Sequence, residues 1–140
     1  DLTVSPDMTF DLRVPKTLMV YEFVKNQDQL ALGGILDKIN QDTILINFWN
    51  VNCAGCFEKI PRLNKIYSDN KYGLININSS SNSDKDALNL FNKYPFPGIN
   101  LKSKIFIEKY FDQNGYPYYC LLDKRSLKVI KSWVGNFELY

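Results

Sequence analysis

Apolar residues along the chain follow two patterns, and the changes from one to the other predict strands alternating with helices. Residues 43–49 (TILINFW) and 72–77 (YGLINI) are short, nearly continuous apolar runs, as in strands buried on both faces of a parallel sheet. Residues 53–68 follow the first run with apolar side chains three and four positions apart, which is the spacing of one helix face. The core is therefore expected to be a sheet whose strands are joined through helices.

The remaining segments predict the elements around this core. The other expected strands are residues 18–24, 117–122 and 127–134. The other expected helices are residues 27–40, 84–93 and 102–112. Ser83 is the expected N-cap of the second of these helices, and a turn at residues 123–126 is expected to join the last two strands into an antiparallel hairpin. The whole is an α/β fold with a mixed central β-sheet.

The chain has 140 residues, which fits one domain. Residues 1–17 are mixed and interrupted by prolines, so we expect a loose lead-in segment with one short strand at residues 9–12. Residues 18–140 are expected to form a single domain. The sequence begins at Asp1 without a Met, and we interpret it as a mature or trimmed form whose targeting segment or membrane anchor lies outside it.

Charge and composition narrow the chemistry. The formal net charge is only +2 and basic residues are scattered among acidic ones, so neither nucleic acid nor an anionic membrane surface is indicated as a partner. The absence of His excludes His-based acid/base catalysis and every metal site that needs His. Three Cys are too few for a closed Cys₄ zinc site and sparse for a disulfide scaffold. We expect no metal and no organic cofactor, and cysteine redox chemistry remains.

Cys53 and Cys56 lie where the apolar run of residues 43–49 gives way to the helix of residues 53–68. Open α/β sheets place their sites at the carboxyl ends of strands, and a helix N-terminus stabilises a thiolate. Cys53 can therefore act as an exposed nucleophile, and Cys56, one turn inward, as the resolving thiol. Alternatively the pair is two inert thiols or a structural staple, which contributes only about 2 kcal/mol in so short a loop.

The sequence around these cysteines resembles the TlpA/ResA-like thioredoxin proteins. Residues 47–56 (NFWNVNCAGC) are similar to the family signature NFWAxWCxxC. Pro61, five residues after the second Cys, predicts a kink in the helix and matches the helix-kinking proline of thioredoxins. Residues 116–123 (YPYYCLLD) are similar to the family segment in which a cis-proline precedes a strand that ends in an acid. Gly135 is similar to the glycine after the last strand, so the resemblance covers residues 43–136.

The resemblance implies a thioredoxin fold: a central mixed β-sheet flanked by helices, with an N-terminal extension and a C-terminal β-hairpin. It implies a thiol–disulfide oxidoreductase in which the Cys53/Cys56 dithiol exchanges with cysteines of protein substrates. Its partners would be a cysteine-containing protein substrate and a redox partner protein. Because the family is extracytoplasmic, the implied location is periplasmic or membrane-anchored, in a bacterium.

The same resemblance points to residues that bind substrate beside the cysteines. Pro117 alone would be interpreted as an ordinary trans turn proline, but after the Cys motif we expect a cis peptide bond. That bond would expose the N–H and C=O groups of Tyr116 to an extended substrate segment. Tyr116 is also expected to add an apolar docking surface, and Trp49 to flank the active site. Cys120 is expected to be a buried small hydrophobe rather than a third redox thiol.

Three features depart from the family pattern. Asn52 stands where the family often has Trp before the first Cys, and Lys59 stands where ResA-type members have Glu. Glu58 is one position earlier, about 100° around the helix, so it does not replace that Glu, and the family's proton relay is not carried over. The Ala54-Gly55 pair matches neither reducing thioredoxins nor strong oxidants, which leaves the direction of electron flow open.

Two other functions remain open. A thioredoxin-like binding or assembly module would keep the Cys pair only as a vestige or a staple, in line with Asn52 and Lys59. A peroxiredoxin-like peroxidase is disfavoured, because that chemistry needs a Thr before the nucleophile and an Arg beside it. Here residues 50–52 are Asn-Val-Asn, and Arg62 lies well down the helix.

Overall fold

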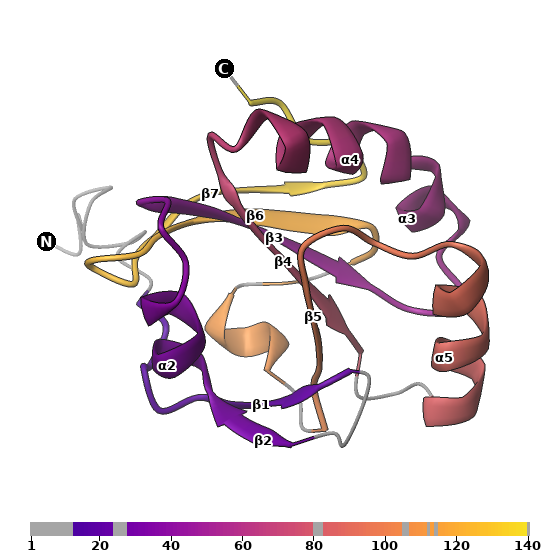
Figure 1. The fold of residues 1–140 in the computed structure, drawn as a ribbon, viewed down its shortest axis with the longest axis horizontal. Coiled ribbons are helices and arrows are strands. Elements are labelled where there is room, and N and C mark those ends of the chain that lie inside the picture. The colour runs from indigo at the N-terminus through magenta and orange to yellow at the C-terminus, as the bar shows by residue number, and fades with distance from the viewer. Residues whose placement is uncertain are drawn as a thin grey trace, which may run out of the picture.

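The computed structural model describes residues 13–23, 28–79, 83–104, 107–111, 113 and 115–139, which form a seven-stranded sheet with helices on both faces (Figure 1). The strands are β1 (Met19–Glu22), β2 (Gln29–Ala31), β3 (Thr43–Trp49), β4 (Gly73–Asn78), β5 (Ile99–Lys102), β6 (Tyr118–Asp123) and β7 (Val129–Val134). The helices are α2 (Leu32–Asp37), α3 (Ala54–Glu58), α4 (Ile60–Asp69), α5 (Asp84–Lys93) and the 3₁₀ helix η1 (Glu108–Tyr110).

The strand order is β2-β1-β5-β4-β3-β6-β7. β3 pairs in parallel with β4 and antiparallel with β6, and β4 pairs in parallel with β5. β6 and β7 form an antiparallel hairpin. The predicted mixed sheet, flanked by helices and followed by a C-terminal hairpin, is confirmed.

Each face of the sheet has its own buried layer, because successive residues of a strand point to opposite faces. Ile44 and Ile46 of β3 pack with α2 and the segment around η1, which we call the α2 layer. Leu45 and Trp49 of the same strand pack under α3, α4 and α5. We call this second cluster the site layer, because it contains both cysteines of the Cys-Ala-Gly-Cys motif.

The helix expected over residues 53–68 is present with the predicted interruption. Lys59 ends α3 and is also the N-cap of α4. Pro61 lies in the first turn of α4, where a missing N–H breaks no helical hydrogen bond. Ser83 caps α5 as expected, since its Oγ accepts a hydrogen bond from the N–H of Asp86 at 3.2 Å.

The helix expected over residues 27–40 is shorter than predicted. Gln29–Ala31 form β2, an edge strand that pairs antiparallel with β1, and only α2 is helical in the described part of this range. Gly33 and Gly34 lower the helix propensity of the segment. The N–H of Gly33 donates to the carbonyl of Lys16 at 2.9 Å, which ties the start of α2 to the segment before β1.

The helix expected over residues 102–112 is wrong for most of the described range. Lys102 is the last residue of β5, and only η1 is helical among the described residues, while residues 105, 106 and 112 lie outside them. The strand β5 is only four residues long and alternates apolar with polar side chains, so its sequence pattern is too short to distinguish it from the residues around it. Lys102 is buried although it is charged, which the pattern does not predict.

The described end of the expected lead-in segment packs on the hairpin. Val14 is buried, and its N–H donates to the carbonyl of Leu127 at 2.8 Å. Arg13 forms an isolated antiparallel bridge with Lys128. The strand expected at residues 9–12 lies outside the described residues.

Candidate active site

Cys53 and Cys56 form a disulfide just beyond the carboxyl end of β3, with an S–S distance of 2.12 Å and a Cα–Cα distance of 5.4 Å. A short turn leads from the strand to the pair, held by a 2.9 Å hydrogen bond from the N–H of Asn52 to Oδ1 of Asn50. Cys53 retains 7% of its surface exposed and Cys56 none. An attacking thiol can therefore approach only the sulfur of Cys53.

The backbone of α3 supports negative charge on Cys53. Cys53 is the N-cap of this helix, and its Sγ accepts a hydrogen bond from the N–H of Cys56 at 3.1 Å. A hydrogen bond to a sulfur atom stabilises the thiolate over the thiol. The Sγ atom of Cys56 points inward, 3.8 Å from the carbonyl oxygen of Phe48 on β3. The two sulfurs thus differ in both exposure and surroundings.

Pro117 lies directly against the helix start. The Tyr116–Pro117 peptide bond is cis, as the sequence resemblance implied. A Cβ atom placed on Gly55 would lie 3.4 Å from Cγ and 3.5 Å from Cδ of Pro117, which is an ordinary van der Waals distance, so the proline ring lies close against the turn between the cysteines. The carbonyl of Pro117 accepts a hydrogen bond from Gly135 at 2.7 Å, which fixes the loop to the end of β7. Sequence reasoning found Pro117 but assigned no part to Gly55.

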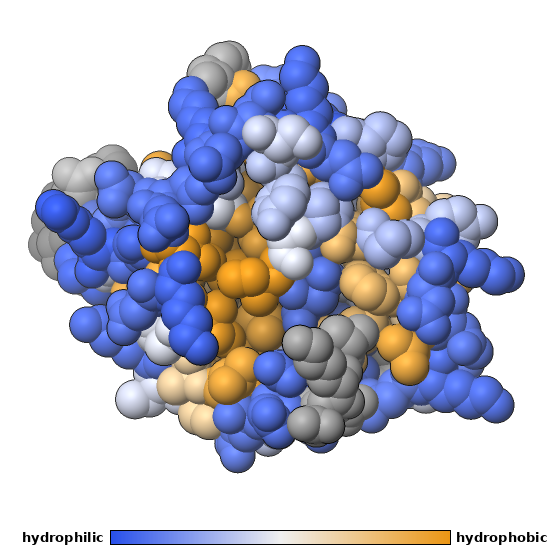
Figure 2. All heavy atoms as spheres, in the orientation of Figure 1, coloured by the Kyte–Doolittle hydropathy of each residue, from blue (hydrophilic) through white to orange (hydrophobic). Residues whose placement is uncertain are grey.

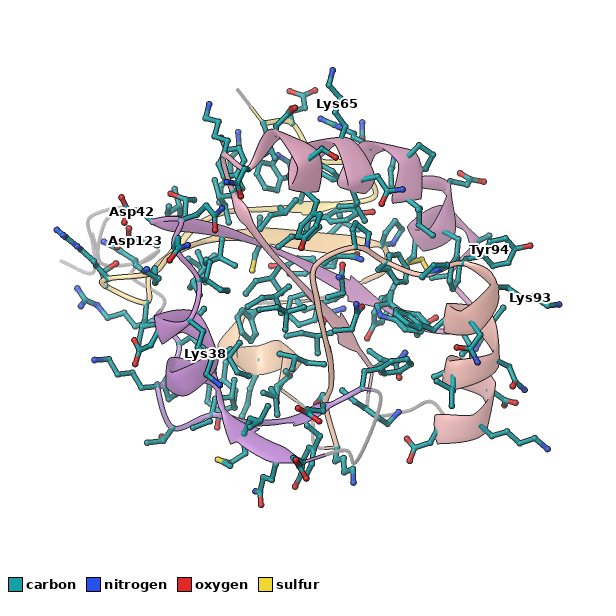
Figure 3. All side chains as sticks on the ribbon, viewed as in Figure 1. Lys38, Asp42, Lys65, Lys93, Tyr94 and Asp123 are labelled. Atoms are coloured by element: carbon teal, nitrogen blue, oxygen red, sulfur yellow. A yellow bond between two sulfur atoms is a disulfide. The ribbon has the colours of Figure 1, made fainter. Side chains whose placement is uncertain are left out.

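Aromatic side chains surround the disulfide from below and from one side. Trp49 is only 1% exposed and lies in the site layer with the cysteines, not at the surface. Its ring contacts Phe57 of α3, with centroids 5.7 Å apart, and Phe57 in turn contacts Tyr94 at 5.8 Å. Tyr94 is 51% exposed and is the C-cap of α5 (Figure 3). Neither Phe57 nor Tyr94 was predicted to lie at the site, although Phe57 directly follows Cys56 and Tyr94 directly follows the helix α5.

No protein-family model matches the sequence, and a comparison with curated proteins finds no relative. Several solved structures share the architecture. The secreted disulfide oxidoreductase of Mycobacterium tuberculosis is 14% identical, with a TM-score of 0.64 over 86% of this chain and 84% of that one. The pneumococcal exposed lipoprotein thioredoxin of Streptococcus pneumoniae is 17% identical, with a TM-score of 0.68 over 86% and 90%. The thioredoxin domain of a Bacteroides vulgatus thiol-disulfide oxidoreductase is 13% identical, with a TM-score of 0.65 over 86% of each chain.

The chain has the thioredoxin fold. The predicted fold class is thereby confirmed, including the mixed sheet and the helices on both sides. Identities this low establish the shared architecture only, and not the chemistry of this chain.

Within this thioredoxin fold, Cys120 lies apart from the disulfide. It is a free cysteine in the middle of β6, completely buried in the α2 layer on the opposite face of the sheet. Burial raises the pKa of its thiol, which keeps it protonated. Its burial is confirmed.

A set of polar residues lies in the site layer, and sequence reasoning missed it. Asn47, Asn76 and Asn78 are buried on β3 and β4. Lys102 on β5 is also buried; its Nζ donates to Oδ1 of Asn78 at 3.0 Å and pairs with Asp84 of α5 at 3.0 Å. The signal was present in the alternating sequences of β4 (GLININ) and β5 (INLK), which mark one face of these strands as polar.

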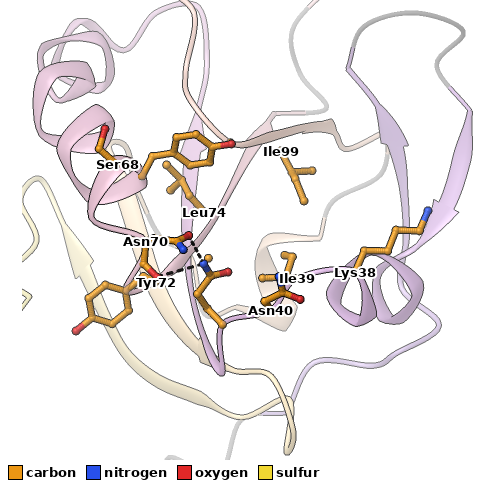
Figure 4. Close-up of a pocket in the computed structure, with 12 residues that line it drawn as sticks. Lys38, Ile39, Asn40, Ser68, Asn70, Tyr72, Leu74 and Ile99 are labelled. Atoms are coloured by element: carbon orange, nitrogen blue, oxygen red, sulfur yellow. Dashed lines mark hydrogen bonds between the residues drawn. The ribbon is translucent and has the colours of Figure 1, made fainter.

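A hollow also lies at the other end of the sheet from the Cys motif. A pocket of about 520 Å³ opens where β4 begins and α4 ends, lined by Asn40, Asn70, Tyr72 and others (Figure 4). Gln41 spans its rim through a 2.5 Å hydrogen bond to Oδ1 of Asn70. Figure 2 shows apolar side chains gathered in a hollow at the middle of the visible face, rimmed by hydrophilic residues. None of the residues that line the 520 Å³ pocket belongs to the Cys motif or the Pro117 loop.

The described residues contain no group of three or more His, Cys, Asp or Glu side chains placed to hold a metal ion. Among the same residues, none of the helices is long and apolar enough to cross a membrane.

Proposed function

We propose that this protein is a thiol–disulfide oxidoreductase that exchanges disulfides with cysteines of other proteins. The observation that carries the proposal is the Cys53–Cys56 disulfide at a strand-to-helix junction with cis-Pro117 packed against it. A staple between two residues three apart adds little stability, so reactivity accounts for the pair better than folding does.

Cys53 is the nucleophile in this proposal, because it keeps 7% of its surface exposed while Cys56 keeps none, and because a backbone N–H is directed at its sulfur. In the oxidising direction a substrate thiolate attacks Cys53 Sγ, the bond to Cys56 breaks, and Cys56 leaves as a thiolate that takes up a proton. A second substrate thiolate then attacks the substrate's own sulfur in the mixed disulfide and releases Cys53. Two electrons pass from the substrate dithiol to the protein, and a redox partner protein removes them. The reducing direction runs through the same steps in reverse.

The loop at Pro117 is the proposed substrate contact. Tyr116 is half-buried and packs against both layers, and it precedes Pro117, whose ring lies next to Gly55. An extended substrate segment would pair with that backbone as an added strand does. Trp49 is only 1% exposed, so it would support the Cys loop from beneath rather than touch the substrate. Pro61 would have a structural role, because it lies in the first turn of α4.

The architecture also supports an extracytoplasmic location. Proteins described as secreted and as an exposed lipoprotein are among those that share it. We propose a periplasmic or membrane-anchored protein in a bacterium, with any anchor outside this sequence.

Trapping the mixed disulfide tests the proposal. The reduced Cys56→Ser chain, mixed with a peptide that contains a disulfide, is expected to retain half of that peptide on Cys53, as measured by intact mass. The matched Cys53→Ser chain is expected to retain none. Equal labelling of the two variants would contradict the assignment of Cys53 as nucleophile.

One observation favours the binding-module alternative: Cys53 keeps only 7% of its surface exposed. It predicts that the wild-type disulfide resists glutathione as well as protein dithiols, whereas an oxidoreductase equilibrates with both. The peroxidase alternative loses further ground, since the guanidinium of Arg62 lies over the ring of Phe137 at 4.1 Å and donates to Asn136.

A further inference from the structure

The pocket of about 520 Å³ lies where the three parallel strands of the sheet begin (Figure 4). Asn40 and Gln41 precede β3, Gly73 begins β4, and Ile99 begins β5. The cysteines follow the other end of β3, so the length of that strand separates them from the pocket. The volume is in the range of small-molecule sites, and no step of disulfide exchange uses it.

Two glycines shape the floor of the pocket. Gly98 has a φ of +89°, and a Cβ atom there would lie only 2.6 Å from the carbonyl oxygen of Leu74. A Cβ atom on Gly73 would lie 2.7 Å from side-chain carbon atoms of both Ile39 and Ile44. A larger residue at either position would push the packed strands apart. With Leu74 and Ile39 buried beside these glycines, the floor is a fixed and mainly apolar surface.

Gln41 and Asn70 are joined across the rim of the pocket. Nε2 of Gln41 donates to the backbone carbonyl of Asn70 at 3.2 Å and to its Oδ1 at 2.5 Å. A backbone carbonyl can only accept, so these contacts determine how both amides are turned. Oε1 of Gln41 and Nδ2 of Asn70 are left without a partner among the described residues. The joined pair therefore offers a ligand one free acceptor and one free donor.

The charges around the pocket favour a neutral ligand. The described residues that line it include no Asp or Glu, so a cationic ligand would find no counter-charge. Lys38 is the one cation among them, and it is exposed. The ten-residue helix α4 ends at the pocket, with Asn70 as its C-cap, and the partial negative charge of a helix C-terminus disfavours a phosphate or a carboxylate. The other polar side chains are amides and hydroxyls, which bind neutral groups through hydrogen bonds.

Tyr67 of α4 adds an aromatic ring to this lining. Its side chain is 54% exposed although it borders the pocket. The C–H face of a sugar ring packs on the face of an aromatic ring, and the hydroxyls at the edge of the sugar both donate to and accept from amides. An apolar floor, an exposed aromatic ring and amides with unused donors and acceptors therefore match a sugar better than an ion or a purely apolar molecule.

We propose that this pocket is a second binding site, for a neutral saccharide. The sugar ring packs on Tyr67, while its hydroxyls donate to Oε1 of Gln41 and accept from Nδ2 of Asn70. The site goes beyond disulfide exchange, because it holds the protein on a sugar or a glycan chain and leaves Cys53, at the other end of β3, free to react. Binding makes and breaks no covalent bond.

An NMR titration of the isotope-labelled intact chain tests the proposal. The probes are glucose, maltose and N,N′-diacetylchitobiose, and glucuronate is the anionic control matched to glucose. At least one neutral probe is expected to shift the side-chain amide signals of Gln41 and Asn70, with a dissociation constant of about 1 mM or below. Tighter binding of maltose than of glucose would identify a glycan chain as the source of the ligand, and equal binding a free sugar. No shift of these signals with any neutral probe, or tighter binding of glucuronate than of glucose, would overturn the proposal.

Substitutions test whether the sugar binds in this pocket. Tyr67→Ala is expected to weaken binding roughly tenfold, because the ring that contacts the sugar is lost. The matched control is Tyr94→Ala, since Tyr94 is 51% exposed but lies outside the pocket, and it is expected to stay within about twofold of the wild type. Equal weakening in the two tyrosine variants would overturn the proposal.

Asn70→Gly tests the amide without disturbing the backbone. Asn70 has a φ of 60°, which glycine adopts readily, so the fold is expected to be retained. The loss of its Nδ2 is expected to weaken binding roughly three- to tenfold, the size of one hydrogen bond. Unchanged binding in this folded variant would overturn the proposed contact. None of these measurements involves the cysteines, so their failure would leave the proposed oxidoreductase function untouched.

Discussion

Cys56 and Cys120 are both completely buried, yet only Cys56 belongs to a disulfide. Cys120 lies in the middle of β6, held between β3 and β7 in the α2 layer. Cys56 lies in the first turn of α3, where the chain leaves the sheet and Cys53 is within bonding distance. Burial alone therefore does not separate the two thiols; what separates them is the position of Cys56 at a strand-to-helix junction beside a second cysteine.

The two layers differ in polarity as well. The α2 layer is largely aliphatic, with Ile44, Ile46 and Ile75 completely buried on the sheet. The site layer adds aromatic rings, buried amides and Lys102. Polar side chains make a layer less stable unless they are paired, so the stability of this layer depends on the hydrogen bonds of its buried amides and of Lys102.

Removing single cysteines gives the largest expected contrast. Cys53→Ser is expected to abolish disulfide exchange with a peptide dithiol, because the cysteine of the pair that keeps exposed surface is lost. Cys120→Ser is expected to retain exchange, since Cys120 lies on the other face of the sheet. The rate of peptide oxidation by the oxidised chain is the measurement. Loss of exchange in Cys120→Ser at unchanged stability would contradict the conclusion that Cys120 takes no part in exchange.

Tyr118 and Tyr119 are neighbours on β6, but their side chains lie in different layers, so replacing each one compares how the two layers contribute to stability. The hydroxyl of Tyr118, in the α2 layer, donates to the carbonyl of Phe111 at 2.5 Å, whereas that of Tyr119, in the site layer, has no partner among the described residues. Tyr118→Phe is expected to lower the free energy of unfolding by about 1–3 kcal/mol, because a buried carbonyl loses its donor.

Tyr119→Phe is expected to leave the free energy of unfolding unchanged or to raise it by up to about 1 kcal/mol, because an unpaired buried hydroxyl is removed. Burial raises the pKa of Tyr119, with Arg62 partly opposing, so the hydroxyl is neutral and no charge is lost. Urea unfolding of both variants is the measurement. A larger loss in Tyr119→Phe than in Tyr118→Phe would show that the site-layer hydroxyl has a partner in solution.

The sequence was most informative where pattern and chemistry coincide. The apolar run of β3, the helix start at Cys53 and the break before Pro61 could all be predicted, because each follows from local periodicity or from the lack of a proline N–H. The cis bond at Pro117 came from resemblance, since the local sequence alone favours trans.

What could not be predicted depends on contacts between distant segments. The residues next to Lys102 in the sequence predict a helix. In the structure Lys102 is a strand residue, because it pairs with β4 and β1. Its contacts with Asn78 and Asp84 offset the cost of burying its charge. Asn47 and Asn76 are ordinary strand residues until register places their amides together. The part of Gly55 likewise depends on a proline about sixty residues later.

The Gly55→Ala substitution tests the contact between Gly55 and Pro117, and its expected effect on exchange is smaller than that of losing Cys53. A Cβ at 3.4 Å from Pro117 is in ordinary contact, and Ala favours the helix over Gly by up to about 1 kcal/mol, so stability is expected to hold or rise slightly. Exchange with a peptide is expected to slow relative to exchange with dithiothreitol, because only the peptide must lie along the Pro117 loop. Equal slowing with both reagents would argue against that loop as the docking surface.

The smallest expected effect lies at the hairpin turn, far from the disulfide in the chain. Hydrogen bonds from the hydroxyl and the N–H of Ser126 hold the pKa of Asp123 below its usual value. A lowered pKa in the folded state stabilises the fold above the unfolded pKa of about 3.9, and this contribution is lost as pH falls through the folded value. Ser126→Ala is expected to raise the pKa of Asp123, as followed by NMR titration, without changing exchange by the cysteines. An unchanged pKa would contradict the hydrogen-bonded turn.

The reduction potential of the Cys53/Cys56 pair tests the central claim most directly. Equilibration of the intact chain with glutathione and dithiothreitol buffers is expected to show a reversible two-electron couple between about −120 and −270 mV, the span from oxidising to reducing dithiol proteins. A disulfide that stays intact in buffers poised below about −300 mV would behave as a structural bond and would contradict the account.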